Sequence, residues 1–396
     1  MSRKRILAAI LASMVTLSAL TGCGGGKKDD VSSGGDGVST VVFATSEADG
    51  KNWQPSVINN GAMTSVMLQF YETLIAWDSN GEMYPLLAES YEFTGDETTG
   101  YKLHVTLREG IKTSAGYPIT ASDVLWSYQW ASEQAEYIKH TSWIDFDNTT
   151  VIDDLNIEFG ITTMNYYILN DLSRVAVTAK KSFDESPDNC LSLPVGSGPY
   201  VMTSYTPDVE FVLEKNPDYW NKDTSRATQL QNVDRIVTKF VTEDSQRTIE
   251  LESGNVDIIM STPFTEIDRY EQEEQFQNFI WDSPETYCVY YNASKGALFD
   301  NELLRQAVSY GIDNKAVVQT LFNGVSHAAV SVVGPNQAAE WDEAYETRDS
   351  IYNYNPEKAK QLLKQAGYGE GDLTYSADAE WLYDGFPDRK KLARSG

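Results

Sequence analysis

The stretch YKLHVTLREGIKTSAGYPITASDV, residues 101–124, carries the clearest fold signals in this chain. Apolar and polar residues alternate from Tyr101 to Leu107, which predicts a strand with one buried face. Thr120 and Asp123 then form the pattern of a capping box, which predicts a helix that begins near Ala121. A strand followed closely by a helix indicates a fold in which both kinds of element are mixed.

The alternation of strands and helices continues on both sides of this stretch. Short apolar runs predict strands at 40–43, 256–259 and 287–291. Apolar residues at helical spacing predict helices at 62–75, 244–253, 303–310, 315–322 and 355–366. Asp244, Asp313 and Asn355 are placed to cap three of these helices. The pattern as a whole predicts an α/β or α+β protein.

The N-terminus carries the pattern of an export signal. Arg3, Lys4 and Arg5 precede the apolar run 6–20, which is shorter than the about 20 residues that a spanning helix needs. The residues before Cys23 look like the lipobox of bacterial lipoproteins. We therefore expect residues 1–22 to be a signal peptide and Cys23 to carry a lipid that holds the chain on the outer face of the cytoplasmic membrane. The alternative is an ordinary signal peptide with a chance cysteine. Residues 23–39, rich in Gly, Ser, Lys and Asp, are expected to form a flexible tether.

Length and charge narrow the class of protein. The 396 residues are enough for two or three domains, and the net charge is −27. Such acidity argues against nucleic acid as a partner and against electrostatic binding to anionic lipid. Aromatic residues make up 12% of the chain, which suits a protein that stacks rings on a ligand, although most of them are expected in the core.

The cysteines and histidines do not indicate a metal site. Cys190 and Cys288 could form a disulfide in an exported protein, but buried free thiols are an equal expectation. His104, His140 and His327 are far apart in the sequence and are not flanked by further ligand types. Neither a metal site nor a cofactor is predicted.

Motifs spread over most of the chain resemble those of the extracellular solute-binding proteins of family 5, the peptide and nickel receptors of ABC importers. The matching segments are 71–74, 85–90, 107–112, 118–124, 196–200 (GSGPY), 216–220 (NPDYW), 253–258, 304–307, 312–313 and 355–368. Each motif alone is weak, but their order and their extent from residue 71 to residue 368 make the resemblance specific.

The resemblance implies an α/β fold like that of the type II periplasmic binding proteins, with two lobes that close over a ligand. Segments 40–60 and 193–283 would form the first lobe, and 61–192 an extra subdomain of that lobe. Residues 284–396 would form a second lobe. This lobe is expected to be incomplete, because relatives continue well past the segment that matches Tyr368.

The resemblance also implies capture of peptides for a membrane permease and its partner ATPase, with the ligand held between the lobes. An acidic residue takes the peptide's amino terminus in such receptors, and Glu47 is a candidate, although a lone loop carboxylate is usually only solvated. The full set of candidate ligand contacts is Ser46, Glu47, Trp53, Trp143, Tyr287, Tyr290 and Asn292. For Trp143, packing in the core is the stronger expectation.

Other functions stay open at this stage. The same fold could hold an oligosaccharide or a nickel chelate, or it could serve a sensor in place of a transporter. A secreted glycoside hydrolase would use paired carboxylates, but pairs such as Asp153–Asp154 arise by chance in so acidic a chain. The sequence contains no nucleophile elbow, P-loop or zinc-protease motif. No catalytic residue is therefore predicted, and an enzyme is not expected.

Overall fold

The computed structural model describes residues 38–55, 66–78, 81–135, 137–165, 167–223, 230–280, 286–329 and 352–371. The chain forms two compact units, Met1–Thr262 and Pro263–Gly396. The crossing into a second lobe at residue 284, which the resemblance implies, stays a prediction. The predicted signal peptide, Cys23 and most of the predicted tether lie outside the described residues.

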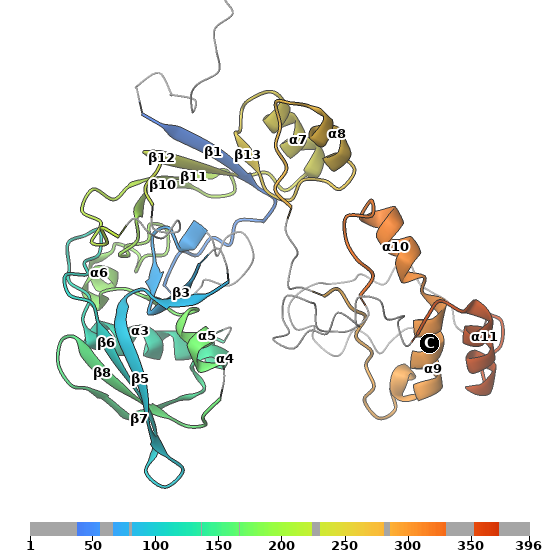
Figure 1. Cartoon of the computed structure of the whole chain (residues 1–396), viewed down its shortest axis with the longest axis horizontal. Helices are drawn as coiled ribbons and strands as arrows, with labels where there is room; N and C mark the ends of the chain where they lie inside the picture. Colours follow the sequence, from blue (N-terminus) through green and yellow to red (C-terminus); the bar gives the residue numbers. More distant parts are fainter. Residues whose placement is uncertain are drawn as a thin grey trace, which may run out of the picture. The chain divides into compact units, whose positions relative to one another are not determined.

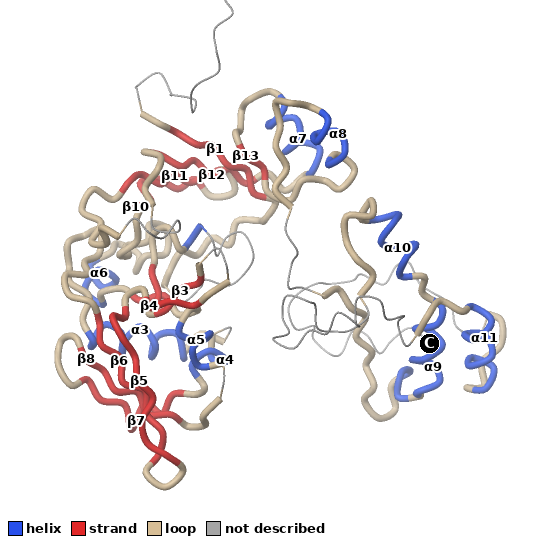
Figure 2. The backbone as a smooth tube through the Cα atoms, in the orientation of Figure 1, coloured by secondary structure: helices blue, strands red, loops and turns tan. Residues whose placement is uncertain are grey.

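The first unit contains a five-stranded sheet in which the first described strand is the fourth in spatial order (Figures 1 and 2). In spatial order, its strands are β10 (Tyr200–Thr206), β11 (Glu210–Lys215), β12 (Arg235–Phe240), β1 (Thr40–Thr45) and β13 (Ile258–Ile259). β1 pairs in parallel with both β12 and β13, while β10, β11 and β12 pair antiparallel. The strand predicted from the apolar run at 40–43 is confirmed.

Helix α7 (Asp244–Glu252) connects β12 to β13, close to the predicted bounds. Its N-cap is Glu243, one residue before the predicted cap Asp244, which lies in the first turn. The helix stops before Gly254, whose φ of 75° a residue with a side chain rarely adopts.

A four-stranded antiparallel sheet occupies the segment between β1 and β10. In spatial order its strands are β5 (Ala88–Asp96), β6 (Gly100–Leu107), β8 (Asn156–Ile161) and β7 (Ile144–Val151). β6 confirms the strand predicted from the alternating stretch, because Leu103, Val105 and Leu107 are all buried. These side chains belong to a large apolar cluster, here called the subdomain core.

Helix α3 (Ala121–Ser132) packs into the subdomain core through Val124 and Tyr128. The carboxylate of Asp123 accepts hydrogen bonds from the backbone N–H and the hydroxyl of Thr120, at 2.8 and 2.7 Å. The predicted helix start is therefore confirmed.

Two small sheets surround the subdomain core. β2 (Glu72–Thr73) pairs with β9 (Ala176–Val177), and β3 (Ile75–Trp77) pairs with β4 (Met83–Pro85). The prediction of a helix through residue 75 is therefore wrong for this part of the segment. The described part of the first unit also contains the short helices α4 (Ile138–Thr141), α5 (Ile168–Leu172) and α6 (Lys180–Glu185).

A second apolar cluster lies against the five-stranded sheet and is here called the sheet core. It contains Trp53, Met67, Phe70, Tyr71, Ala176, Tyr200, Met202, Phe211 and Leu213. Tyr71 belongs to the sheet core, whereas Leu74 belongs to the subdomain core. The chain thus passes from one core to the other within strand β2.

The second unit is helical where it is described. Its elements are α8 (Ile267–Gln272), the 3₁₀ helix η2 (Leu298–Asp300), α9 (Glu302–Gly311), α10 (Asn314–Leu321) and α11 (Pro356–Gln365). The predicted caps are confirmed, because Asp313 accepts from the N–H of Ala316 and Asn355 from that of Lys358. The strand predicted at 287–291 is wrong, since these residues form no strand and most are exposed.

The two cysteines outside the signal region are free thiols in this structure. Cys190 is buried in the first unit, and Cys288 is exposed in the second. Of the two expectations from the sequence, the structure bears out free thiols, although only one of them is buried.

Candidate functional site

The carboxyl ends of three parallel strands meet at one edge of the five-stranded sheet. The pairing continues to this edge, where Val241 N–H donates to Thr45 O at 3.0 Å and Met260 N–H donates to Ala44 O at 2.9 Å. In open α/β sheets, ligands bind in the crevice outside the carboxyl ends of the strands. We call residues 46–47, 241–242 and 260–261 the carboxyl-edge site.

A fully buried arginine fixes the loops of the carboxyl-edge site. Arg247 extends from α7 and donates to the carbonyl oxygens of Val241 at 2.8 Å, Thr242 at 2.9 Å and Ser261 at 3.1 Å. Asp244 provides its counter-charge. Both terminal nitrogens of the guanidinium are hydrogen-bonded, whereas its buried Nε–H has no hydrogen-bond partner. The contacts of the terminal nitrogens hold two separate loops in one conformation.

Two of the predicted ligand contacts lie at the carboxyl-edge site. Ser46 and Glu47 are half-buried directly after β1, and the Ser46 hydroxyl donates to that of Ser261 at 3.1 Å. Ser261 and Arg247 are not predicted from the sequence, because nothing in the local pattern around them indicates a shared loop.

Trp53, a third predicted contact, lies elsewhere. Its side chain is 2% exposed and packs in the sheet core against Phe70, Tyr205 and Phe211, with ring centroids 5.0 to 6.1 Å apart. In this structure Trp53 is therefore a core residue.

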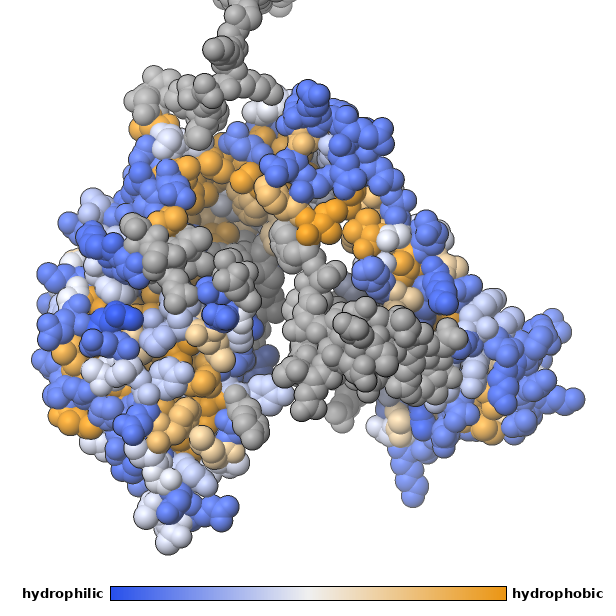
Figure 3. Space-filling model, in the orientation of Figure 1, coloured by the Kyte–Doolittle hydropathy of each residue, from blue (hydrophilic) through white to orange (hydrophobic). Residues whose placement is uncertain are grey.

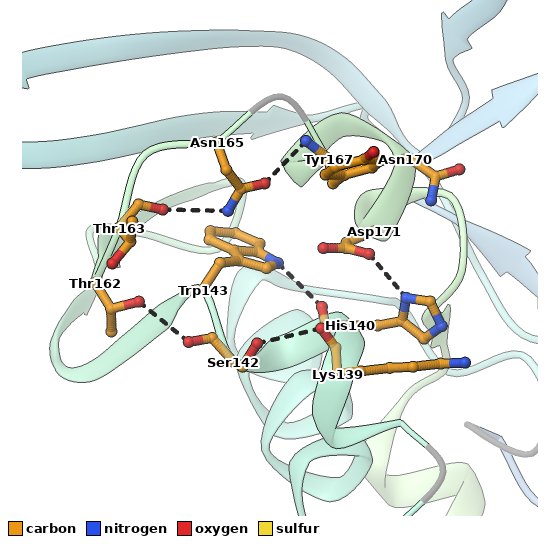
Figure 4. A pocket seen from close by; sticks show the side chains of 10 residues that line it. All are labelled: Lys139, His140, Ser142, Trp143, Thr162, Thr163, Asn165, Tyr167, Asn170 and Asp171. Atoms are coloured by element: carbon orange, nitrogen blue, oxygen red, sulfur yellow. Dashed lines mark hydrogen bonds and ion pairs between the residues drawn. The ribbon is translucent and has the colours of Figure 1, made fainter. Parts of the chain in front are cut away.

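A pocket of about 480 Å³ lies between α4 and α5 in the subdomain and is here called the α4–α5 pocket (Figure 4). It is lined by Lys139, His140, Ser142, Trp143, Thr162, Thr163, Asn165, Tyr167, Asn170 and Asp171. Its walls mix hydroxyl, amide and aromatic groups, a composition that suits a small polar ligand.

His140 and Asp171 form the ionisable pair of the α4–α5 pocket. The Nδ1 atom of His140 lies 2.8 Å from Oδ1 of Asp171, and the two side chains are 20% and 11% exposed. In a neutral imidazole that donates from Nδ1 to this carboxylate, Nε2 is an acceptor, and in the protonated form it is a donor. The pair can thus meet either kind of ligand group.

Trp143, a fourth predicted contact, lines this pocket but is 3% exposed. Its indole N–H donates to the carbonyl of His140 at 3.0 Å (Figure 4). Its ring also packs on Phe159. Trp143 is therefore mainly a packing residue that holds His140 in place. The pairing of His140 with Asp171 is not predicted from the sequence, because the two residues are 31 residues apart and carry no shared motif.

The remaining predicted contacts belong to the second unit. Tyr287 is 84% exposed and Tyr290 is 90% exposed, and the side chain of Asn292 accepts from the N–H of Ser294 at 3.1 Å. The Tyr287 ring lies 6.2 Å from that of Phe322. Exposure of this kind leaves both tyrosine rings accessible to a ligand.

Within the ranges that the structure describes, no three His, Cys, Asp or Glu side chains are grouped so that they could hold a metal ion. Within the same ranges, no helix has the length and apolar character needed to cross a membrane.

Comparison with known proteins finds a family whose pattern covers most of the chain. The family described as bacterial extracellular solute-binding proteins, family 5 (middle part), matches residues 82–394. Heme-binding protein A of Haemophilus influenzae is 27% identical over 367 residues, which are 84% of this chain and 62% of the relative. Glutathione-binding protein GsiB of Escherichia coli is 26% identical over 324 residues, 81% of this chain and 60% of the relative. The chain thus spans about three fifths of the length of these relatives.

Solved structures of the same kind share the fold. NikZ from Campylobacter jejuni, in complex with Ni(L-His), superposes with a TM-score of 0.70 at 19% identity, over 84% of this chain and 64% of NikZ. The periplasmic binding protein DppA from Helicobacter pylori, in complex with the peptide STSA, gives 0.66 at 23% identity, over 83% and 66%. The mixed α/β fold is therefore that of the two-lobed periplasmic binding proteins, as the sequence predicts.

Proposed function

Because the chain belongs to the bacterial extracellular solute-binding proteins of family 5, we propose that it captures a peptide outside the cytoplasmic membrane and delivers it to the permease of an ABC importer. The observation that carries this proposal is the family match over residues 82–394. The relatives named above are binding proteins, and one solved structure holds a peptide. Energy for transport would come from a partner ATPase, so the chain itself catalyses nothing.

The carboxyl-edge site and the α4–α5 pocket are the parts of the first unit that would contact the ligand. Glu47 would attract the ammonium group of a peptide, and the hydroxyls of Ser46 and Ser261 would bond to its backbone. His140, which can donate or accept at Nε2, would meet a second polar group.

The second unit would supply Tyr287, Tyr290 and Asn292, of which both tyrosine rings are exposed. Exposed rings gain most from stacking on a ligand that covers them. Trp53 and Trp143 would act as packing residues behind the ligand contacts, because the side chain of each is nearly fully buried.

Other ligands remain as alternatives within the same proposal. The structure of NikZ holds a nickel–histidine complex, and named relatives bind heme or glutathione. An oligosaccharide is a further candidate for the same fold. In a different class, a secreted glycoside hydrolase would need two carboxyl groups facing each other across a sugar. Release of reducing sugar from a polysaccharide by the purified protein would favour the hydrolase.

The lipid anchor is part of the proposal. Cys23 would be acylated and would hold the protein on the outer face of the cytoplasmic membrane. The pattern around Cys23 supports this, since a basic start and an apolar run precede it. A Cys23→Ser variant should leave the membrane fraction, whereas Cys288→Ser should stay in it, and unmodified Cys23 in protein from membranes would contradict the anchor.

A ligand-dependent melt tests peptide capture. A ligand that binds only the native state stabilises it by about 2.7 kcal/mol at a hundredfold excess over its dissociation constant. We expect the melting temperature to rise with a pool of short peptides, and to rise less with glutathione or with nickel and histidine. A rise with one of the latter alone would assign that ligand in place of peptide.

Two histidine variants test whether the α4–α5 pocket takes part in ligand binding. His140→Ala should weaken binding about tenfold, or about 1.4 kcal/mol, because it removes a polar contact and exposes Asp171. His104→Ala, on strand β6, should leave the affinity unchanged. Equal affinities for the two variants would remove the pocket from the proposed site.

A further inference from the structure

A buried carboxyl group lies where the two cores of the first unit meet. Glu72, on strand β2, is 2% exposed and accepts three hydrogen bonds. Its Oε2 accepts from the Ser197 hydroxyl and from the Trp220 indole N–H, and its Oε1 accepts from the Tyr219 hydroxyl, all at 2.7 Å. Every donor belongs to a chain segment far from β2 in the sequence.

These contacts cross the boundary between the subdomain core and the sheet core. Ser197 precedes β10 and Tyr219 follows β11, so both lie in segments that adjoin the five-stranded sheet. The ring of Trp220 packs against the subdomain core, while its N–H points to Glu72. Beside them, the N–H groups of Gly198 and Tyr200 donate to the carbonyls of Phe70 and Gln69. We call this set of contacts the Glu72 joint.

The donors of the Glu72 joint are all neutral. A hydroxyl, a phenol and an indole surround the carboxyl group, and the Lys222 ammonium nearby donates to the backbone carbonyl of Tyr219. The further titratable group here is Tyr84, whose charge would act on Tyr219. Burial of Glu72 without a cation bonded to it favours the protonated form of the carboxyl group. The three hydrogen-bond donors favour the ionised form.

Protonation must rearrange the joint. The indole of Trp220 can only donate, so it needs an unprotonated oxygen of Glu72 in either state. A protonated Glu72 needs an acceptor for its own hydrogen, and the Ser197 or Tyr219 hydroxyl must then turn from donor to acceptor. The geometry of the joint therefore differs between the two forms of Glu72.

We propose that Glu72 makes the joint between the two cores of the first unit sensitive to the pH of the surroundings. The carboxyl-edge site belongs to the five-stranded sheet and the α4–α5 pocket to the subdomain, so the joint sets how these two surfaces are connected. An increase in pH loosens this connection, and acid strengthens it.

The direction of the pH effect follows from the balance between burial of Glu72 and its hydrogen bonds. Burial raises the pKa of Glu72 more than the three hydrogen bonds lower it, to about 7 from an ordinary 4.5. The folded state thus holds the proton more tightly than the unfolded state. The stabilising contribution is complete below about pH 4.5 and is lost as the pH rises through 7.

Nuclear magnetic resonance of the Trp220 indole N–H in the whole protein tests the proposal directly. We expect its signal to shift between pH 5.5 and 8.5 with a midpoint near pH 7, and the shift to be absent in Glu72→Gln. Hydrogen exchange at Gly198 and Tyr200, corrected for the intrinsic effect of pH, should become about tenfold faster across this range in the wild type. Glu92→Gln, an exposed change on β5, should behave like the wild type.

A second variant keeps the test decisive if Glu72→Gln does not fold. Ser197→Ala removes one hydrogen bond that favours the ionised carboxylate, so the midpoint should move to higher pH. A Trp220 signal that is constant over the whole range overturns the proposal, and so does a midpoint that Ser197→Ala leaves in place. Neither readout depends on the ligand, so failure of peptide binding would leave this result unaffected.

Discussion

Close backbone contact fixes the turn at residues 196–200. A Cβ atom on Gly198 would lie 2.5 Å from the carbonyl oxygen of Gln69 and 2.6 Å from the Cα of Phe70. Both are backbone atoms that cannot turn aside. This contact explains why the GSGPY segment requires glycine, and it links the turn to the Glu72 joint beside it.

Gly198→Ala should therefore destabilise the protein by about 3 kcal/mol, because the backbone must separate to admit a methyl group. Gly50→Ala is the matched control, since no atom lies within 4 Å of its added Cβ, and its effect should stay within about 0.5 kcal/mol. Urea unfolding of the two variants measures both values. Similar midpoints for the two variants would contradict the contact.

The buried Arg247 allows a second prediction at this scale. Arg247→Leu leaves the carbonyls of Val241, Thr242 and Ser261 without their donor, so we expect a loss of about 3–5 kcal/mol in the free energy of unfolding. Arg269→Leu, which removes a partly exposed guanidinium, should cost about 1 kcal/mol or less. Circular dichroism during urea unfolding compares them, and equal losses would mean that burial of Arg247 does not matter.

Helix starts are the best-predicted elements of this chain. The caps Asp313 and Asn355 could be identified because a cap and the N–H that it binds are three residues apart. Likewise, the alternation in β6 and the capping box of α3 depend on neighbours in the sequence. Local signals of this kind need no knowledge of the fold.

Asn355 offers a test of such a signal. Asn355→Ala removes the acceptor for the N–H of Lys358 and should destabilise α11 by about 1 kcal/mol. Asn355→Asp keeps an acceptor oxygen and should cost little. Amide hydrogen exchange in the first turn of α11 measures the difference, and equally fast exchange in both variants would show that the cap has no effect.

The wrong helix prediction and the unpredicted contacts also have a physical origin. Apolar residues at 62–75 have helical spacing, but β2 and β3 are only two and three residues long, and both residues of β2 and the first residue of β3 are buried. The partners of Glu72 are 125, 147 and 148 residues away, so no local pattern could identify the joint. The pairing of His140 with Asp171 was missed for the same reason.

At the scale of the whole molecule, the two units differ in how much apolar surface they bury. The first unit has two apolar cores, whereas the buried apolar residues of the second, where it is described, are Ile267, Tyr270, Leu304, Ala307, Ala359 and Leu362. Several large apolar side chains of the second unit are exposed, including Leu321 at 66%, and Figure 3 shows hydrophobic side chains on the surface around α10. Less burial means less stabilisation per residue.

The second unit should therefore open first in denaturant. In hydrogen exchange followed by mass spectrometry, the backbone amides of α9 and α11 should lose their protection at lower urea concentrations than those of β5, β6, β7 and β8. Loss of protection at the same urea concentration in both sets would mean that the two units unfold together.

The position of β1 between β12 and β13 has a consequence for synthesis. Ser39, at the start of this strand, hydrogen-bonds with Asp234, 195 residues later in the chain. At about 5–20 residues per second, ribosomes need on the order of 10–40 s to make that interval. During this time the four-stranded sheet, complete at Ile161, can already form, while the apolar strand β1 has neither β12 nor β13 beside it. The strand that is made first is thus paired last, and in that interval its unpaired edges are open to other chains.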